Sequence, residues 1–327
     1  MNYGGSVNSD DLPLSRLGLD RDTARRTQAG LLESLAADPA TRVLTVRGTQ
    51  VLADFSTEEP ELVTTPADGG PSGAADADVL WAYLGTAAGR HYLAALEPAA
   101  TEESPGQHWP AGNGPADRAA DGPRAVNLRD IGALLGEVDA ALATAALALA
   151  NWHSGHQHCP RCGARTVVEA AGWVRRCPQE GSQHFPRTDP AVIMAITDPD
   201  DRLLIARSAH WPATQYSVPA GFVEPGESLE AAVRREVLEE TRVRVGPVAY
   251  RASQPWPFPA SLMCAFTGRS QDRQPVADGD EVVDARFVAR AEIAQAWADG
   301  LIRPPRPTSV ARALIEDWFG QPLPRPR

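Results

Sequence analysis

Residues 221–243 read GFVEPGESLEAAVRREVLEETRV, and the second half of this stretch predicts a helix. Glu236, Glu239 and Glu240 stand at positions i, i+3 and i+4, so a helix would stack three carboxylates on one face. Three like charges destabilise a bare helix, which indicates that a cation compensates them. Oxygen ligands of this kind suit Mg²⁺ or Mn²⁺. A divalent ion held by carboxylates can polarise a phosphoryl group and orient an attacking water.

The alternative for an isolated EVLEE segment is a solvated acidic face, with Arg234 and Arg235 as local ion pairs. That alternative leaves the preceding loop unexplained, where Gly226 follows Pro225 and Ser228 is a candidate helix N-cap. Loop and helix together match the pattern G-x5-E-x7-R-E-U-x-E-E-x-G-U, where U is a bulky aliphatic residue. The matching positions are Gly221, Glu227, Arg235, Glu236, Val237, Glu239, Glu240 and Val243. The stretch resembles a Nudix box, the signature of hydrolases that act on nucleoside diphosphates linked to another group.

One position departs from this pattern, because the chain has Arg242 where glycine is expected. A glycine after a helix commonly adopts the left-handed backbone conformation, and another residue there costs about 1 kcal/mol. Either the helix ends differently, or Gly246 takes up the turn. The metal-binding carboxylates precede this point, so the departure bears on the loop more than on the chemistry.

A proline-aromatic segment, SQPWPFPASLM, follows at 253–263. Its prolines lack backbone N–H donors, which excludes a central strand and stiffens the segment. Trp256 and Phe258 would then form a platform for an adenine or nicotinamide ring; the alternative is an edge segment whose aromatic rings pack on the core. Within a Nudix protein this segment resembles the NADH pyrophosphatase family. Its members cleave the pyrophosphate of NAD(H) to NMN(H) and AMP, and members also remove NAD caps from RNA.

The resemblance covers roughly residues 150–320 and implies further site residues. A fourth metal carboxylate comes from DGDEVVDARF (278–287), where Glu281 is the matching position and Asp284 the nearby competitor. Arg235 is expected to orient the helix carboxylates by pairing with them. The additional residues that the resemblance places near the nucleotide are Phe185, Phe222 and Ala311.

A cysteine cluster precedes the Nudix box. Cys159 and Cys162 form a C-x2-C half-site, and Cys177 follows at a spacing typical of a zinc ribbon. The second half-site lacks its cysteine, since position 180 is Glu180, and His184 is four residues further on. Zinc accepts oxygen and nitrogen ligands, so we predict a structural Zn²⁺ held by the three thiolates and either Glu180 or His184. The alternative is a ribbon without metal. The family carries four cysteines here, so the fourth ligand stays open.

The composition of the 327 residues narrows the function further. Thirty-one basic and 42 acidic residues give a net charge of −11, and no residue is lysine. The acidic balance argues against a protein that coats nucleic acid through net charge. The absence of lysine excludes a Schiff-base enzyme and the GK[ST] phosphate loop. The N-terminal stretch does not resemble a secretory signal, and the longest apolar run, 140–150, is too short to span a membrane. We therefore expect a cytoplasmic protein.

The pattern along the chain predicts an α/β protein. An N-terminal α+β domain (1–126), a rudimentary domain by family resemblance, contains loops at 64–78 and 101–124. A connecting helix (127–156), with a helical pattern over Leu128–Trp152, leads to a zinc ribbon (157–187). The catalytic domain (188–320) is expected to be a Nudix α/β/α sandwich with a mixed sheet, followed by a tail (321–327).

These expectations combine into one functional hypothesis: metal-dependent hydrolysis of NAD(H), with NAD-capped RNA as a further substrate. Family resemblance also implies a homodimer. Two alternatives remain, namely another Nudix substrate such as ADP-ribose or a diadenosine polyphosphate, and a non-catalytic nucleotide or RNA sensor. The sequence leaves open which glutamate is the general base, and whether free NAD(H) or capped RNA is the main substrate.

Overall fold

The computed structural model describes residues 7–67, 79–98 and 122–324. Most of the two predicted loops, at 68–78 and 99–121, therefore lies outside the described residues. The described ends of those loops are strands, β4 (Thr64–Pro66) and β7 (Pro123–Asn127). The chain forms two compact units. One contains described residues 7–15, 189–255 and 261–324, and the other contains 16–67, 79–98, 122–188 and 256–260.

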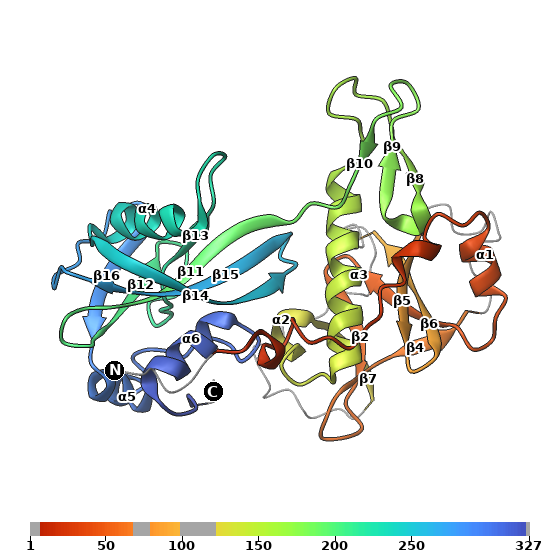
Figure 1. Cartoon of the computed structure of the whole chain (residues 1–327). Helices are drawn as coiled ribbons and strands as arrows, with labels where there is room; N and C mark the ends of the chain where they lie inside the picture. Colours follow the sequence, from red (N-terminus) through yellow and green to blue (C-terminus); the bar gives the residue numbers. More distant parts are fainter. Residues whose placement is uncertain (1–6, 68–78, 99–121, 325–327) are drawn as a thin grey trace. The chain divides into compact units, whose positions relative to one another are not determined.

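The first unit is built on a mixed sheet whose described strands run in the order β14-β15-β11-β12-β16, with β13 paired to β11 (Figure 1). The central strand β11 is parallel to β15 and antiparallel to β12 and β13. The strands are β11 (Asp189–Thr197), β12 (Leu203–Ser208), β13 (Ala220–Phe222), β14 (Val245–Trp256), β15 (Ser261–Ser270) and β16 (Val282–Val288). Pro255 falls in the edge strand β14, where a missing N–H costs no ladder bond to a further strand.

Helices cover both faces of this sheet. Val192, Met194 and Ile196 of β11 pack in one core cluster with α4 (Leu229–Thr241). The intervening residues of β11, Ile193 and Ala195, pack in a second cluster with α5 (Arg290–Ala298) and α6 (Val310–Phe319). Since successive strand residues point to opposite faces, both faces of β11 are buried. The predicted α/β/α sandwich with a mixed sheet is confirmed.

The ends of α4 follow from local chemistry. The Ser228 hydroxyl accepts a hydrogen bond from the Ala231 N–H at 3.2 Å, which confirms the predicted N-cap. Arg242 itself takes the left-handed conformation at the C-cap, with φ 58° and ψ 16°. Both predicted alternatives are wrong. The helix ends at the position where the pattern has glycine, and Gly246 lies within β14 and does not form the turn. The chain therefore bears the backbone strain at Arg242.

The second unit contains a sheet with the described order β3-β2-β1-β6-β5, in which β4 also pairs with β1 and β7 with β2. Strands β1 and β6 are parallel, whereas β5 and β6 form an antiparallel hairpin. The remaining bounds are β1 (Arg42–Arg47), β2 (Gln50–Asp54), β3 (Glu61–Leu62), β5 (Leu80–Ala87), β6 (Arg90–Glu97) and α1 (Leu31–Ala36). Short 3₁₀ turns occur at η1 (Ser9–Asp11) in the first unit, and at η2 (Thr23–Arg25) and η4 (Ala170–Gly172) here.

The helix predicted as one piece over Leu128–Trp152 is two helices, α2 (Leu128–Ile131) and α3 (Glu137–Gly155). The prediction was wrong between them, where Gly132 ends α2 and Gly136 takes an extended conformation as the N-cap of α3. The apolar residues of α3 continue the periodic pattern of α2, so periodicity alone does not predict the break between the two helices.

Three short strands follow α3 and form a separate sheet in the order β10-β9-β8. They are β8 (Val167–Glu169), β9 (Val174–Arg176) and β10 (Gln183–His184). This ribbon carries the cysteine cluster. The five-part division drawn from the sequence stays a prediction. Within the described part of the chain, no helix has the length and apolarity needed to cross a membrane.

Candidate active site and zinc centre

Strand β13 and helix α4 meet at Gly221 and Glu236. A Cβ atom on Gly221 would lie 2.0 Å from the carboxyl carbon of Glu236 and 2.2–2.3 Å from its two oxygens. The first residue of the sequence pattern therefore has a direct physical reason, because the Glu236 carboxylate occupies the space of a side chain at 221. Only 12% of the Glu236 side chain is exposed.

Arg235 holds three of the pattern's carboxylates with one guanidinium. It donates to both oxygens of Glu227, with Nε–Oε1 and Nη2–Oε2 distances of 2.9 Å. Its Nη1 donates to Glu236 at 2.9 Å and to Glu239 at 3.0 Å. Nη2 also donates to the Phe222 carbonyl at 2.8 Å, which ties the loop to the helix. These carboxylates raise the pKa of Arg235, so it stays charged.

Glu240 is the most buried carboxylate of the helix, at 5% exposure. Burial first, and then the charges of Glu236 and Glu281, raise the pKa of Glu240 to about 8. Burial also raises the pKa of Glu236, against the opposing effect of Arg235. Glu281 contributes to the shift of both groups, and Glu239 does too. The structure thus brings the four predicted glutamates into one electrostatically coupled cluster.

Glu281 reaches this cluster from a tight turn before β16. The Asp278 side chain accepts hydrogen bonds from the N–H groups of Asp280 at 3.0 Å and Val282 at 2.9 Å, on either side of Glu281. The Asp278 N–H donates to the Glu240 carbonyl at 3.1 Å, so the turn is docked on the last turn of α4. Sequence reasoning missed this role of Asp278; its signal is an Asp directly before a glycine, Asp278-Gly279, which is typical of a turn.

Asp284, the alternative to Glu281 as the fourth carboxylate, contacts Tyr216 and Arg286. It accepts a short hydrogen bond from the Tyr216 hydroxyl, and its carboxylate lies 3.9 Å from Arg286. Asp284 is not among the charges that shift Glu236 or Glu240, whereas Glu281 is. The structure therefore favours Glu281 as the fourth member of the cluster.

The donor set of this cluster fits a hard divalent cation. It offers only carboxylate oxygens, which Mg²⁺ and Mn²⁺ prefer. Burial and then the crowding of like charges favour protonation of Glu240, and a divalent cation would relieve that repulsion without a proton. Arg235 compensates Glu227, Glu236 and Glu239 from one side, and among the described residues Glu240 forms no ion pair.

The predicted nucleotide-contacting residues are distributed over both units. Phe222 is exposed at the end of β13, and Phe185 is exposed just after β10. Trp256 and Phe258, at the tip of the β14–β15 hairpin, stand edge to face with ring centroids 4.9 Å apart. Ala311 is 2% exposed in the core cluster under α6. Their roles toward a nucleotide stay predictions.

The cysteine cluster is formed by two knuckles of equal backbone geometry. In the first, the Gly163 N–H donates to the Cys159 carbonyl at 2.9 Å, and Gly163 has a positive φ of 73°. In the second, the Gly181 N–H donates to the Cys177 carbonyl at 2.9 Å, with φ 70°. The segments CPRCG and CPQEG therefore fold alike, and Glu180 occupies the place of the fourth cysteine.

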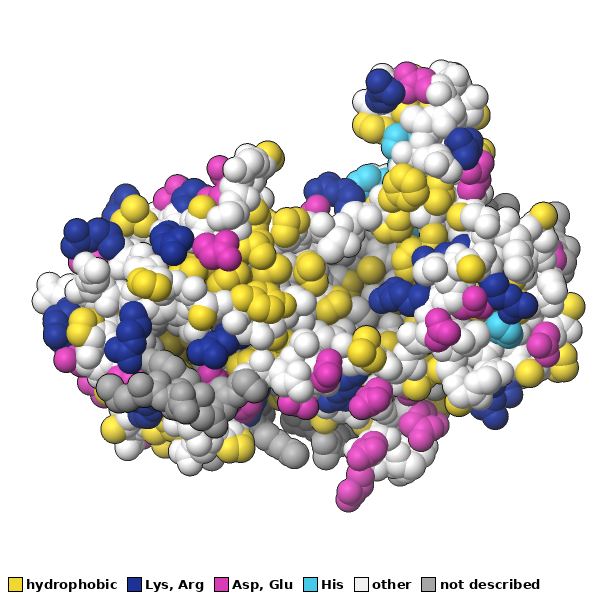
Figure 2. Space-filling model, viewed as in Figure 1, with side chains coloured by type: hydrophobic (Ala, Val, Ile, Leu, Met, Phe, Trp, Pro, Cys, Tyr) yellow, Lys and Arg dark blue, Asp and Glu magenta, His cyan; other side chains and the backbone are white. Residues whose placement is uncertain are grey.

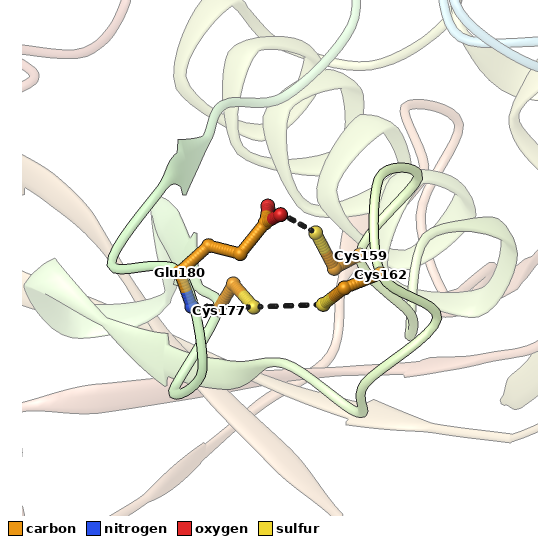
Figure 3. Close-up of side chains that lie close together, drawn as sticks. All are labelled: Cys159, Cys162, Cys177 and Glu180. Atoms are coloured by element: carbon orange, nitrogen blue, oxygen red, sulfur yellow. Dashed lines mark hydrogen bonds between the residues drawn. The ribbon is translucent and has the colours of Figure 1, made fainter.

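Figure 3 shows the side chains of Cys159, Cys162, Cys177 and Glu180 converging on one point. Their ligand atoms lie within 4.8 Å of one another. The Cys159 thiol donates to Glu180 at 3.6 Å, and the sulfurs of Cys162 and Cys177 are 3.4 Å apart. His184 is not in this group. Its Nε2 is 3.3 Å from the Ser182 hydroxyl, which in turn lies 3.9 Å from the Cys159 sulfur. Three thiols and one carboxylate suit tetrahedral zinc.

Two family models match the segments that contain these residue clusters. Residues 154–185 match the family model "NADH pyrophosphatase zinc ribbon domain", and residues 187–306 match "NUDIX domain". The chain is 35% identical to "NAD-capped RNA hydrolase NudC" of Mycobacterium bovis (strain BCG / Pasteur 1173P2), over 93% of this chain and 94% of the relative.

The chain belongs to the NADH pyrophosphatase (NAD-capped RNA hydrolase) family of the Nudix superfamily. The same figures hold for the relative of that name from Mycobacterium tuberculosis (strain ATCC 25177 / H37Ra). "NAD-capped RNA hydrolase NUDT12" of Homo sapiens is 36% identical over 57% of this chain and 43% of the human protein. As a member of this family, the chain carries a zinc ribbon and a Nudix domain, and the resemblance inferred from the sequence is confirmed.

Proposed function

We propose that this chain hydrolyses the pyrophosphate of NAD(H), giving NMN(H) and AMP, and removes NAD caps from the 5′ ends of RNA. The observation that carries the proposal is the coupled cluster of Glu236, Glu239, Glu240 and Glu281, together with Arg235. The proline-aromatic hairpin tip supports a dinucleotide as the substrate. The names of the mycobacterial and human relatives support the same reaction.

In this proposal the four glutamates hold Mg²⁺ or Mn²⁺, which would neutralise the diphosphate and activate a water. Arg235 keeps Glu236 and Glu239 in place and prevents their rotation away from the cluster. Gly221 leaves room for the Glu236 carboxylate. Burial and the neighbouring carboxylates raise the pKa of Glu240, and a bound divalent cation would favour its ionised form. Fixed charges of this kind stabilise a transition state without reorganisation.

The ribbon site is proposed to hold a structural Zn²⁺ with Glu180 as the fourth ligand. Its support is the repeated knuckle, which puts Glu180 where the first knuckle has Cys162. All four positions come from protein side chains, so the site has no open position for a substrate, as in structural zinc sites.

The decisive test is NADH turnover with Mg²⁺ or Mn²⁺, with products resolved by mass, beside a Glu239→Gln variant. Glu239 is suited to this control because its side chain is 60% exposed, so the change spares the core. We expect NMNH and AMP to form only with metal and intact Glu239. Absence of turnover with retained NADH binding would refute hydrolysis and support a non-catalytic sensor.

A panel of ADP-ribose, a diadenosine polyphosphate, NADH and NAD-capped RNA tests the substrate. We expect NADH and the capped RNA to exceed the other two in kcat/KM. A preference for ADP-ribose would refute the substrate assignment and keep the chemistry. On the face shown in Figure 2, arginine and acidic side chains are interspersed. That pattern gives no support to binding of RNA through a continuous basic surface.

Family membership also supports a homodimer in the cytoplasm as part of the proposal. Light scattering coupled to size-exclusion chromatography measures the oligomeric state, and we expect twice the chain mass. Fractionation of the source cells tests the cytoplasmic location.

A further inference from the structure

The hairpin tip formed by residues 256–260 is held by an asparagine far away in the sequence. Asn151 lies on α3, and its Nδ2 donates to the Pro257 carbonyl at 2.8 Å and to the Pro259 carbonyl at 3.1 Å. Both amide hydrogens of one side chain are therefore used on the two prolines that flank Phe258. The tip and α3 belong to the same compact unit.

The carbonyls at Pro257 and Pro259 need such a donor. Proline has no backbone N–H, so a segment with three prolines forms few hydrogen bonds of its own. Within residues 256–260, the Phe258 N–H donates to the Trp256 carbonyl at 2.7 Å. Asn151 adds two more bonds and fixes the backbone on both sides of the Phe258 ring.

The rings carried by this tip are also packed from the side. The guanidinium of Arg129, on α2, lies 4.4 Å from the Phe258 ring centroid and 5.9 Å from that of Trp256. The Trp256 and Phe258 rings cross at 76°. The tip thus has one defined arrangement of two aromatic rings, set by residues of the N-terminal half of the chain.

We propose that Asn151 is a positioning residue that pre-organises Trp256 and Phe258 for stacking against a base ring of the dinucleotide. The inference rests on the proposed function and deepens it, because it links substrate recognition to α3. Without the clamp, the tip would sample other conformations, and each binding event would have to select the competent one. The effect falls on binding, since stacking on a base remote from the diphosphate acts equally in the ground and transition states.

The test is the nearly isosteric substitution Asn151→Asp, which removes both donors while keeping the size of the side chain. We expect KM for NADH to rise about tenfold or more, as for the loss of two ordinary hydrogen bonds, with kcat within twofold. Asn151→Gln, which retains the donors, should recover part of the loss. Ser154→Ala is the matched control, because Ser154 is exposed on the same helix and bonds only the Asn151 backbone carbonyl, at 2.9 Å.

Equilibrium binding gives a second readout. NADH fluorescence titrations in a Glu239→Gln background should show the same rise in Kd for Asn151→Asp. The control Ser154→Ala should leave the melting temperature unchanged. Unchanged KM and Kd in Asn151→Asp, or a fall in kcat alone, would overturn the inference. If Asn151→Asp does not fold, Asn151→Gln decides, because its longer side chain displaces both donors from the Pro257 and Pro259 carbonyls. A Kd for Asn151→Gln within twofold of the wild-type value would overturn the inference. Wild-type turnover tests the proposed function independently of these ratios.

Discussion

Gly221→Ala tests the position of the Glu236 carboxylate separately from the stability of the fold. The added Cβ would lie 2.0 Å from the Glu236 carboxyl carbon, and ordinary contact begins at 3.4 Å, so the carboxylate must move by about 1.4 Å. The backbone at 221 does not oppose alanine, because its φ is not in the left-handed range. The whole effect therefore falls on Glu236.

A displacement of this size breaks the 2.9 Å bond from Arg235 to Glu236 and moves one ligand of the proposed metal site. Misplacement of a catalytic group by about 1 Å costs about 100-fold in rate, which corresponds to about 2.7 kcal/mol of transition-state stabilisation. Stability changes far less. The lost hydrogen bond is offset in part by the about 0.4–1 kcal/mol that alanine contributes by restricting the unfolded chain.

The assay is kcat/KM for NADH with Mn²⁺, beside thermal unfolding of the same preparation. Gly246→Ala is the matched control, since a Cβ there meets only the Arg269 carbonyl, at 3.5 Å. We expect Gly221→Ala to lose about two orders of magnitude in kcat/KM with a melting temperature close to the wild type. A Gly221→Ala protein with activity within threefold of the control would show that the Glu236 position is not critical, and the site argument would fail.

Three further predictions follow from other parts of the chain. Arg242→Gly should raise the free energy of unfolding by about 1 kcal/mol in urea titrations, because Arg242 has φ 58°; an unchanged value would show that its side chain offsets the strain. Glu180→Cys should slow zinc removal by a chelator roughly tenfold, and His184→Ala should leave it unchanged, as ligand and non-ligand positions predict; the opposite order would make His184 the ligand. Acidification from pH 7 to 5 should destabilise the wild type by about 2 kcal/mol more than His153→Gln. The sign follows from burial, which lowers the pKa of His153 to about 4, so its contribution is present above the unfolded value of about 6.5 and is lost as pH falls toward 4; equal slopes of stability against pH would refute it.

The sequence predicted the sandwich and its helix-bound carboxylates because both are local patterns. The continuous apolar run in β11 and the i, i+3, i+4 spacing in α4 each depend on residues within one element. The break between α2 and α3 was missed because apolar periodicity continues across Gly132 and Gly136. The environment of His153, near the end of α3, is likewise not predicted by local sequence: its side chain is 5% exposed and forms hydrogen bonds with the Gly172 carbonyl and Arg175. Its burial depends on the fold around it.

The contacts that position the site could not be read from spacing. Asn151 is 106 residues from Pro257, and no pattern in either segment predicts the hydrogen bond between them. The Nudix pattern marks Gly221 and Glu236 as important residue types, but it does not say that one occupies the side-chain space of the other. A motif records which residues a site needs, whereas their mutual distances follow only from the packing of β13 against α4.

The two departures from the family pattern share a physical explanation. At Glu180 the knuckle turn is fixed by the Gly181 N–H bond to Cys177, so the ligand type can change without a change in the turn. At Arg242 the end of α4 is fixed by the Arg242 N–H bond to the Leu238 carbonyl, and by Asp278, whose N–H reaches the Glu240 carbonyl. Neighbouring backbone bonds thus hold both positions in the family's geometry. A side chain there alters affinity or strain and leaves the arrangement of the glutamates intact, so both departures are compatible with a working site.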